Sequence, residues 1–342
     1  MLTPRRPPVT ATLTDLTGLI DGYQTTAVLH AAVQLDLPDR LANGPTGTYG
    51  LANAMGVDVD RLRRLLGALS AVGVCRDEGD DIFSLTEAGH ALTSGSATGL
   101  RQRLLLAATY YAPVWTRIER SVRDGVTAFD AMHGCTPWQN RQQHPVTDEL
   151  FNSWLELETG RLASLIAPTL DLAGVAHVTD IGGGTGALLN ALLDLHPALK
   201  ATLFDQPHVV TQAEARWGDA GRARVPVAVG GDFMDEVPVH ADAYILKSIL
   251  HDWTDPEALR ILHNCRRAMP SGARLLLIER VLPAHPPDDP ATHFVDLHMM
   301  LVTGGRERSL AQFESLLEGA GLKPRGHRAT PTAFTIIEAL AP

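Results

Sequence analysis

The residues best suited to chemistry form a short stretch, 247–253 (KSILHDW), that follows an apolar run. Its histidine, His251, can serve as a general base, because the unperturbed pKa of histidine is about 6.5. Asp252 stands beside it, and Trp253 offers a flat surface for stacking. A lone histidine is more often structural, so this hypothesis depends on where the rest of the sequence places the stretch.

A glycine-rich segment, 182–187 (GGGTGA), comes shortly after Asp180, at the end of another apolar run. Glycines let the backbone approach a ligand closely and leave the first turn of a helix free to receive a negative group. The spacing of Gly182, Gly184 and Ala187 also fits the dinucleotide-binding fingerprint. The loop alone therefore leaves open a nicotinamide enzyme and an enzyme with another nucleoside-type cofactor.

Two acids close the apolar runs that come next. Asp205 lies about 20 residues after the glycine loop, where a carboxylate can accept hydrogen bonds from two ribose hydroxyls. Asp232 follows Gly231 and precedes Phe233, a combination that suits the amino group and the face of an adenine. Each acid by itself is more simply explained as a turn or helix-cap residue. Their positions at consecutive strand ends favour a binding site.

The elements that must position these residues alternate between short apolar runs and helical segments in the second half of the chain. This pattern predicts a doubly wound, Rossmann-like α/β fold with a parallel sheet, which binds ligands beyond the carboxyl ends of its strands. The motifs described above all fall at that edge. The predicted strands cover residues 177–181, 200–204, 225–229, 241–246, 273–278 and 333–339.

The N-terminal part is predicted to be mainly helical, with helices over residues 13–37 and 60–72 and two short strands within 74–85. Asp58 is expected to cap the second helix. A helix–turn–helix followed by a hairpin is a winged-helix plan, whose usual function is DNA binding. Asp58, Asp60 and the acidic hairpin tip would repel phosphates, so we favour a structural or dimerising role.

Length and composition narrow the class of protein. The 342 residues suit more than one domain, and the predicted division is 1–95 for dimerisation, 96–170 as a helical linker and acceptor-pocket segment, and 171–342 for catalysis. A net charge of −10 argues against a nucleic-acid partner. No apolar run reaches the ~18–20 residues that a membrane span needs, and no signal peptide is predicted. Three cysteines without a C-x-x-C pair indicate neither a disulfide framework nor a zinc site, so a cytoplasmic location is expected.

In their order along the chain, these motifs resemble the class I small-molecule O-methyltransferases of the caffeate and hydroxyindole type, including bacterial enzymes of antibiotic biosynthesis. Residues 304–309 (GGRERS) complete the set. The resemblance covers nearly the whole chain, because that family also begins with a winged-helix-like dimerisation domain. It implies S-adenosylmethionine as the cofactor and a small, phenolic acceptor. A homodimer is expected as well, because the apolar stripe of the first predicted helix is long for a small domain to cover.

The resemblance also implies a role for each site residue. His251 would be the catalytic base, with Glu307, Asp252 and Glu279 as the acids around it. For Glu279, a strand-end surface acid is an equally simple explanation. Asp205 would hold the ribose, and the loop at Gly182 would face the methionine part of the cofactor. The implied cofactor-binding residues are Asp180, Gly182, Gly184, Asp205, Gly231, Asp232, Phe233, Lys247 and Trp253.

The wall of the acceptor pocket is a separate prediction. Many relatives have Met where this chain has Leu155, so Leu155 and Trp154 reshape that wall. The other candidates can equally be ordinary core residues, since methionine and aromatic side chains fill cores. The candidate wall residues are Phe129, His133, Trp138, Trp154, Leu155, Met299 and Met300.

The implied reaction is an in-line displacement at a sulfonium, for which the protein must align the acceptor and remove its proton. His251 would take that proton, and Glu307 or Asp252 would orient the ring. No metal is needed, and Asp288 and Asp289 are predicted to form a solvated turn rather than a magnesium site. Three alternatives stay open: a nicotinamide oxidoreductase, a winged-helix regulator, and carbon or nitrogen methylation on the same scaffold.

Overall fold

The computed structural model describes residues 12–221, 224–238, 240–284 and 289–342. Contacts divide the chain into two compact units. The first comprises Met1–Thr116 with Arg141–Glu158, and the second comprises Arg117–Asn140 with Thr159–Pro342. Residues 96–170 are thus distributed over both units, and the predicted three-part division stays a prediction.

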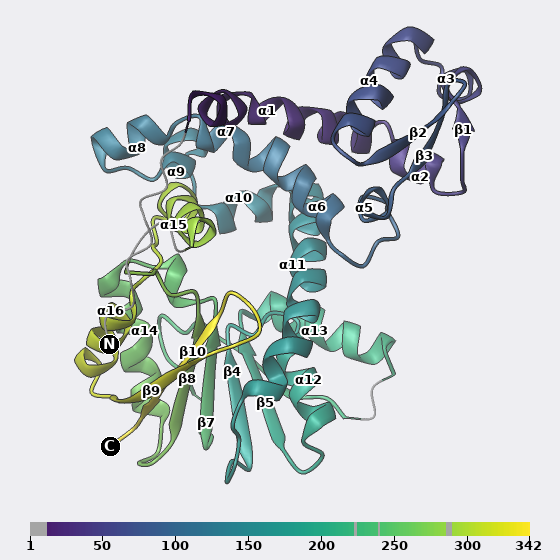
Figure 1. Cartoon of the computed structure of the whole chain (residues 1–342). Coiled ribbons are helices and arrows are strands. Elements are labelled where there is room, and N and C mark those ends of the chain that lie inside the picture. The colour runs from purple at the N-terminus through teal and green to yellow at the C-terminus, as the bar shows by residue number, and fades with distance from the viewer. Residues whose placement is uncertain (1–11, 222–223, 239, 285–288) are drawn as a thin grey trace, which may run out of the picture. The chain divides into compact units, whose positions relative to one another are not determined.

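The first unit contains the predicted helix–turn–helix and hairpin (Figure 1). Its elements are α1 (Leu13–Gln34), α2 (Leu37–Leu41), β1 (Thr46–Gly47), α3 (Thr48–Met55), α4 (Val59–Ala71), β2 (Cys75–Gly79), β3 (Ile82–Leu85), α5 (Glu87–His90), α6 (Leu100–Leu105), a π-helical turn (Leu106–Tyr111), α7 (Ala112–Trp115) and the first part of α11 (Pro145–Ile166). Asp58 caps α4, and its carboxylate accepts the backbone N–H of Arg61 at 2.8 Å. The two-residue strand β1, too short to leave a sequence pattern, pairs with β3.

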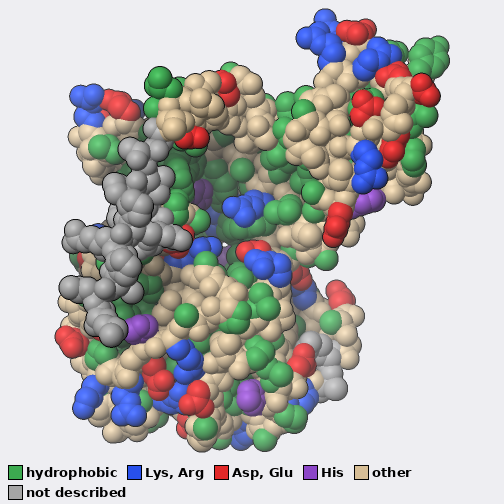
Figure 2. Space-filling model, in the orientation of Figure 1, with side chains coloured by type: hydrophobic (Ala, Val, Ile, Leu, Met, Phe, Trp, Pro, Cys, Tyr) green, Lys and Arg blue, Asp and Glu red, His purple; other side chains and the backbone are tan. Residues whose placement is uncertain are grey.

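The surface of the winged-helix part does not concentrate positive charge. Arg63 on α4 donates two hydrogen bonds, each 2.8 Å long, to the carboxylate of Asp81 in the hairpin. On the face seen in Figure 2, acidic and basic side chains alternate over this part of the first unit. This arrangement supports the structural interpretation of the motif over DNA binding.

Helix α1 packs into the core of the first unit only near its C-terminal end, where Ala32 and Val33 are buried. Towards its N-terminal end the apolar side chains face solvent, and Leu19 and Ile20 are each 72% exposed. None of the described helices combines the length and the apolarity that a bilayer crossing requires.

The second unit is built on a seven-stranded sheet in the order β6-β5-β4-β7-β8-β10-β9 (Figure 1). Its elements are α8 (Ile118–Asp124), α9 (Ala128–His133), the first part of helix α10 (Pro137–Gln143), the last part of α11, β4 (His177–Ile181), α12 (Ala187–Leu195), β5 (Lys200–Asp205), α13 (Pro207–Asp219), β6 (Val227–Gly230), β7 (Ala243–Lys247), α14 (Asp255–Ala268), β8 (Arg274–Glu279), α15 (Pro290–Val302), α16 (Leu310–Gly319), β9 (Lys323–Ala329) and β10 (Thr335–Leu340). The doubly wound sheet is as predicted, except that β10 pairs antiparallel with both neighbours and β9 was not predicted.

Helices cover both faces of this sheet. Alternate residues of a strand point to opposite faces, so neighbouring residues of one strand pack into different cores. Tyr244 and Leu246 of β7 pack into one core with α14 and α16. Ala243 and Ile245 of the same strand pack into a second core with α12 and α13. Strand β7 is therefore buried on both faces, and its charged residue, Lys247, lies at the strand end.

Candidate active site

The segment that carries His251 starts with a sharp turn at the carboxyl end of β7. Ser248 has a φ of 55°, in the left-handed region that non-glycine residues rarely adopt. Its backbone N–H donates to the carbonyl of Ile278 at 3.1 Å. A 3₁₀ turn at Leu250–Asp252 follows, and Thr254 then caps α14 through a capping box with Glu257. The turn is strained at Ser248 and held at both ends, by the hydrogen bond to Ile278 and by the cap at Thr254. It therefore fixes the position of His251 at the carboxyl edge of the sheet.

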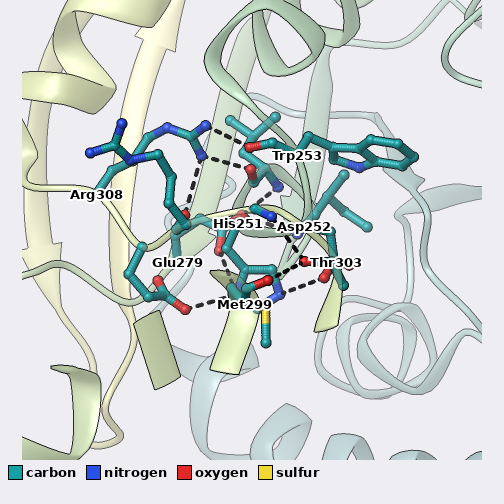
Figure 3. A network of polar contacts seen from close by, with 12 residues as sticks. His251, Asp252, Trp253, Glu279, Met299, Thr303 and Arg308 are labelled. Carbon is teal, nitrogen blue, oxygen red and sulfur yellow. Dashed lines mark hydrogen bonds and ion pairs between the residues drawn. The ribbon is translucent and has the colours of Figure 1, made fainter. Parts of the chain in front are cut away.

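The side chain of His251 lies among three carboxylates. Its Nδ1 is 2.9 Å from Oε1 of Glu307 and 3.9 Å from Oε2 of Glu279, and its Nε2 is 3.9 Å from Oδ1 of Asp252. The side chains of both glutamates are fully buried, and that of His251 is 14% exposed. Figure 3 shows His251 with Glu279 and Asp252 around it. A hydrogen bond from Nδ1 to Glu307 orients the ring and leaves Nε2 as the nitrogen that can take up a proton.

Glu279 is buried at the end of β8, which excludes the surface-acid interpretation of this residue. Its Oε1 accepts the backbone N–H groups of Ile249 at 3.0 Å and Leu250 at 2.8 Å. One oxygen thus anchors the segment that carries His251, while the other faces the ring itself. Glu279 therefore supports His251 through both the backbone and the charge.

The environment changes the charge state that the sequence suggested for His251. Burial opposes charging of the ring, but the attraction of Glu279 and Asp252 and the hydrogen bond to Glu307 outweigh it and raise the pKa of His251 to about 10. Burial raises the pKa of Glu279 to about 7, against the attraction of His251. The ordinary histidine pKa does not apply here, because the surrounding carboxylates favour the protonated ring.

The glycine loop lies between β4 and α12, beside two acids. Asp180 is buried, and its Oδ1 has no hydrogen-bond partner among the described residues. Burial raises the pKa of Asp180 to about 7, which the charge of Lys247 opposes. Asp205 accepts the backbone N–H of Gly184 at 2.8 Å and that of Gln206 at 2.7 Å. Asp205 therefore fixes the loop, and its role towards a ribose stays a prediction.

The predicted site glycines Gly182, Gly184 and Gly231 differ in backbone conformation and in the space around them. A Cβ on Gly182 would lie 2.4 Å from Cδ1 of Ile249, and Gly182 also has a φ of +70°. Gly184 has a φ of +61° with open space around it. A Cβ on Gly231 would lie 2.6 Å from the ring of Phe204, so packing explains this glycine without a ligand. Only the first two have the conformation expected of a ligand-binding loop.

The predicted adenine residues form part of an aromatic cluster. Phe233 meets Trp253 edge to face, with ring centroids 6.0 Å apart. Trp138 stacks on Trp253 with centroids 5.3 Å apart and planes 6° apart. Trp138, predicted as a wall of the acceptor pocket, therefore contacts a predicted cofactor residue. Asp232 is exposed and accepts the backbone N–H of Met234 at 2.8 Å. This contact is the one expected if Asp232 is simply a turn residue.

The other candidates for the acceptor wall belong to both units. Phe129 is fully buried, with its ring 4.3 Å from that of His133. Met299 and Met300 are half-buried on α15, and Met299 is seen close to the His251 network in Figure 3. Trp154 and Leu155 belong to the first unit, where Trp154 packs edge to face against Phe151. The acceptor wall stays a prediction.

Two polar residues of α15, Asp296 and His298, lie close to the His251 group although the sequence pointed to neither. Oδ1 of Asp296 accepts the backbone N–H of Glu307 at 2.8 Å, which holds the acid that orients His251. Burial, together with the charge of His251, lowers the pKa of His298 to about 4. No helix was predicted over this region, and the only sequence signal for either residue was its nearness in sequence to Met299. Asp288 lies outside the described residues, whereas Asp289 caps α15 by accepting the N–H of Thr292.

Comparison with known proteins identifies the family. A profile described as the O-methyltransferase domain matches residues 115–323, and one described as the O-methyltransferase dimerisation domain matches residues 17–95. The chain belongs to the O-methyltransferase family. The phenazine O-methyltransferase PhzM of Lysobacter antibioticus is 34% identical to it over 325 residues, which cover 95% of each chain.

Two further relatives of this O-methyltransferase indicate the range of the family. An O-methyltransferase from neocarzinostatin biosynthesis, solved with S-adenosylmethionine and 2-hydroxy-5-methyl naphthoic acid, has a TM-score of 0.80 at 33% identity, covering 93% of this chain and 96% of that chain. The 8-amino-8-demethylriboflavin N,N-dimethyltransferase of Streptomyces davaonensis is 33% identical over 318 residues, 91% of this chain and 90% of its own. The comparisons confirm the predicted fold class, the methyltransferase activity and the cofactor.

Proposed function

We propose that this O-methyltransferase methylates a hydroxyl of a small aromatic metabolite, with His251 as the general base. The observation that carries the proposal is the pair formed by His251 Nδ1 and Glu307 Oε1, 2.9 Å apart at the carboxyl edge of the sheet. The phenazine and naphthoate named for its relatives are aromatic, which supports an aromatic acceptor. A homodimer formed through the N-terminal helices belongs to the same proposal.

The residues at the glycine loop fit S-adenosylmethionine. Asp180 offers a buried, unpartnered carboxylate oxygen that suits a cationic group, and Gly182 and Gly184 leave the backbone open beside it. Asp205 retains lone pairs for hydroxyl donors beyond its two backbone bonds. Trp253 and Phe233 would bind the adenine. When bound, the cofactor supplies a methyl group already activated by its sulfonium.

His251 has a proton affinity suited to a phenol. With a pKa of about 10 it matches a phenolic hydroxyl, whose pKa is also about 10. Transfer of the proton from the acceptor to Nε2 is then close to thermoneutral. Glu307 stabilises the imidazolium that results. Because the carboxylates favour the protonated ring, that proton must leave for solvent before Nε2 can act as the base.

The group formed by His251, Glu279 and Glu307 could also accommodate a metal ion, since one ligand atom from each lies within 4.8 Å of the others. In this structure Oε1 of Glu307 is engaged by His251, and Oε1 of Glu279 by two backbone N–H groups. We therefore assign the cluster to proton uptake and to orientation of the ring, for which these hydrogen bonds are already in place.

Substitution of His251 tests the proposed base. His251→Ala should retain affinity for S-adenosylmethionine but lose about 10²–10⁴-fold in turnover at neutral pH, the usual effect of removing a general base. Because the pKa values of His251 and of a phenol are both about 10, native and variant turnover should both rise below that pH, and the loss should shrink only above it, where solvent supplies the phenolate. His263→Ala, an exposed histidine on α14, is the matched control. Near-normal turnover of His251→Ala at neutral pH would reject the assignment.

Nitrogen methylation is the second candidate, because one relative is an N,N-dimethyltransferase. The two functions are separated by incubating the protein with labelled S-adenosylmethionine and matched pairs of phenols and anilines. Mass spectrometry then locates the added methyl group. Label on phenolic oxygen supports O-methylation. Label confined to the aniline nitrogen would instead show that the protein methylates nitrogen.

A further inference from the structure

Arg308 has the largest fully buried side chain among the described residues, and its guanidinium points away from the ring of His251 into the protein. A buried cation is costly unless each of its donors is paired with good geometry. The residues that pair with Arg308 therefore indicate why an arginine occupies this position in the 304–309 segment.

The guanidinium bonds to backbone on both sides of the base. Its Nη1 donates to the carbonyl of Leu250 at 2.7 Å, and its Nη2 donates to the carbonyl of Trp253 at 2.8 Å. Nε donates to Oδ1 of Asp255 at 2.9 Å, which balances the charge at the start of α14. The two carbonyls come directly before and directly after the His251–Asp252 pair.

Backbone contacts from the same segment reinforce this attachment. The N–H of Arg306 donates to the carbonyl of His251 at 2.8 Å. A Cβ on Gly305 would lie 2.1 Å from that carbonyl oxygen, so the approach of the two segments requires a glycine. Glu307, which lies between Arg306 and Arg308, binds the ring of His251. One short segment thus fixes both the backbone and the side chain of His251.

We propose that Arg308 is a positioning residue that couples the cofactor site to the base. By binding the carbonyls of Leu250 and Trp253 together, it fixes the ring of His251 and the indole of Trp253 relative to each other. Arg308 touches no reacting group and acts through these residues. The proposal rests on the proposed function for His251 and Trp253.

Only a planar guanidinium can make this set of contacts. Its donors form a rigid fork that reaches two carbonyls and a carboxylate at once, whereas an ammonium group is a point charge with a shorter reach. Arg308→Lys therefore keeps the charge and removes the fork. Arg274→Lys is the matched control, because Arg274 is also largely buried and bonds to Glu338 at 2.9 Å in β10, at the opposite end of β8 from Glu279.

Calorimetry with S-adenosylhomocysteine and pH profiles of turnover are the two measurements. In Arg308→Lys we expect weaker binding of S-adenosylhomocysteine together with a fall in kcat on the order of 10²-fold, because a displacement of about 1 Å at a reacting group can cost that much. We also expect the rising limb of the pH profile to move to lower pH as His251 separates from Glu307. Arg274→Lys should lower the melting temperature and leave both measurements unchanged.

A double-variant cycle with Glu307→Gln separates positioning from general destabilisation. If Arg308 acts through the His251–Glu307 pair, the loss of kcat from Arg308→Lys should be much smaller in the Glu307→Gln background than in the native protein. Equal losses in both backgrounds would overturn the proposal. So would a folded Arg308→Lys that keeps both kcat/KM and S-adenosylhomocysteine affinity within twofold of the native values.

If Arg308→Lys does not fold, Asp255→Asn provides the second test. The side chain of Asp255 is half exposed, so this substitution removes the counter-charge of Arg308 without opening the core. It should weaken S-adenosylhomocysteine binding and kcat in the same direction, and unchanged values would overturn the proposal. The binding measurement does not depend on the identity of the base, so a failure of His251 as base stays distinguishable from a failure of Arg308 as a positioning residue.

Discussion

Glu307 controls the charge of His251, and this relation predicts the pH dependence of the enzyme. A neighbouring carboxylate stabilises the imidazolium, so its removal lowers the pKa of His251 from about 10. We predict that kcat/KM of the native protein rises with pH towards that value as the ring loses its proton. In Glu307→Gln the rising limb should lie at lower pH, by on the order of one unit or more, since an opposite charge typically shifts a pKa by ~1–3 units.

The maximal rate of Glu307→Gln should fall at the same time, because the ring is no longer oriented by a charged acceptor. Profiles recorded with two phenols of different pKa distinguish titration of the enzyme from titration of the acceptor. A nuclear magnetic resonance titration of the His251 ring provides an independent check. A rising limb at the same pH in both proteins would show that Glu307 does not set the charge of His251.

At the residue scale, the sequence identified His251 and Glu307 but not the atoms that hold them. Their proximity follows from a family resemblance and from strand-end positions. The contacts of Glu279 with the N–H groups of Ile249 and Leu250 depend on how β8 packs beside β7, 30 residues earlier in the sequence. Local pattern cannot show that Arg308 is fully buried while Arg306, two residues away, is half exposed.

At the scale of elements, capping chemistry predicted the start of α4. Asp58 accepts the backbone N–H of Arg61 at the start of the helix that the sequence assigned to it. Strand β9 was missed because its charged and mostly exposed residues are typical of a sheet edge and do not alternate with apolar ones. The direction of β10 was missed because apolar periodicity carries no information on strand direction.

The glycine loop and the end of β5 act together, which makes Asp205 a test of the cofactor site. Asp205→Ala removes both the predicted ribose acceptor and the bond of 2.8 Å that holds the N–H of Gly184. We predict a large loss of S-adenosylmethionine affinity in calorimetry, on the order of 10-fold or more, since a hydrogen bond to a charged group contributes ~1.5–3 kcal/mol. Asp235→Ala, an exposed acid beyond the site, is the control. Unchanged affinity of a folded Asp205→Ala would reject the ribose role.

At the scale of the whole molecule, the exposed stripe of α1 predicts the assembly. Leu13, Leu19, Ile20 and Tyr23 are all more than two-thirds exposed, and the last three belong to the region, residues 17–95, that matches a dimerisation domain. Apolar side chains grouped on one helix gain free energy when a second copy covers them. We therefore predict a homodimer in which α1 of each subunit contributes to the interface.

Sedimentation equilibrium at micromolar concentration should give twice the mass of one chain. The double variant Leu19→Asp with Ile20→Asp should shift the protein to the mass of one chain, because unpaired carboxylates are costly to bury in an apolar interface. Val227→Asp, which places one carboxylate at a 64% exposed apolar position on β6, should leave the dimer intact. Circular dichroism confirms that each variant is folded. A native protein that sediments as a single chain, or a double variant that stays dimeric, would mean that this face of α1 does not form the interface.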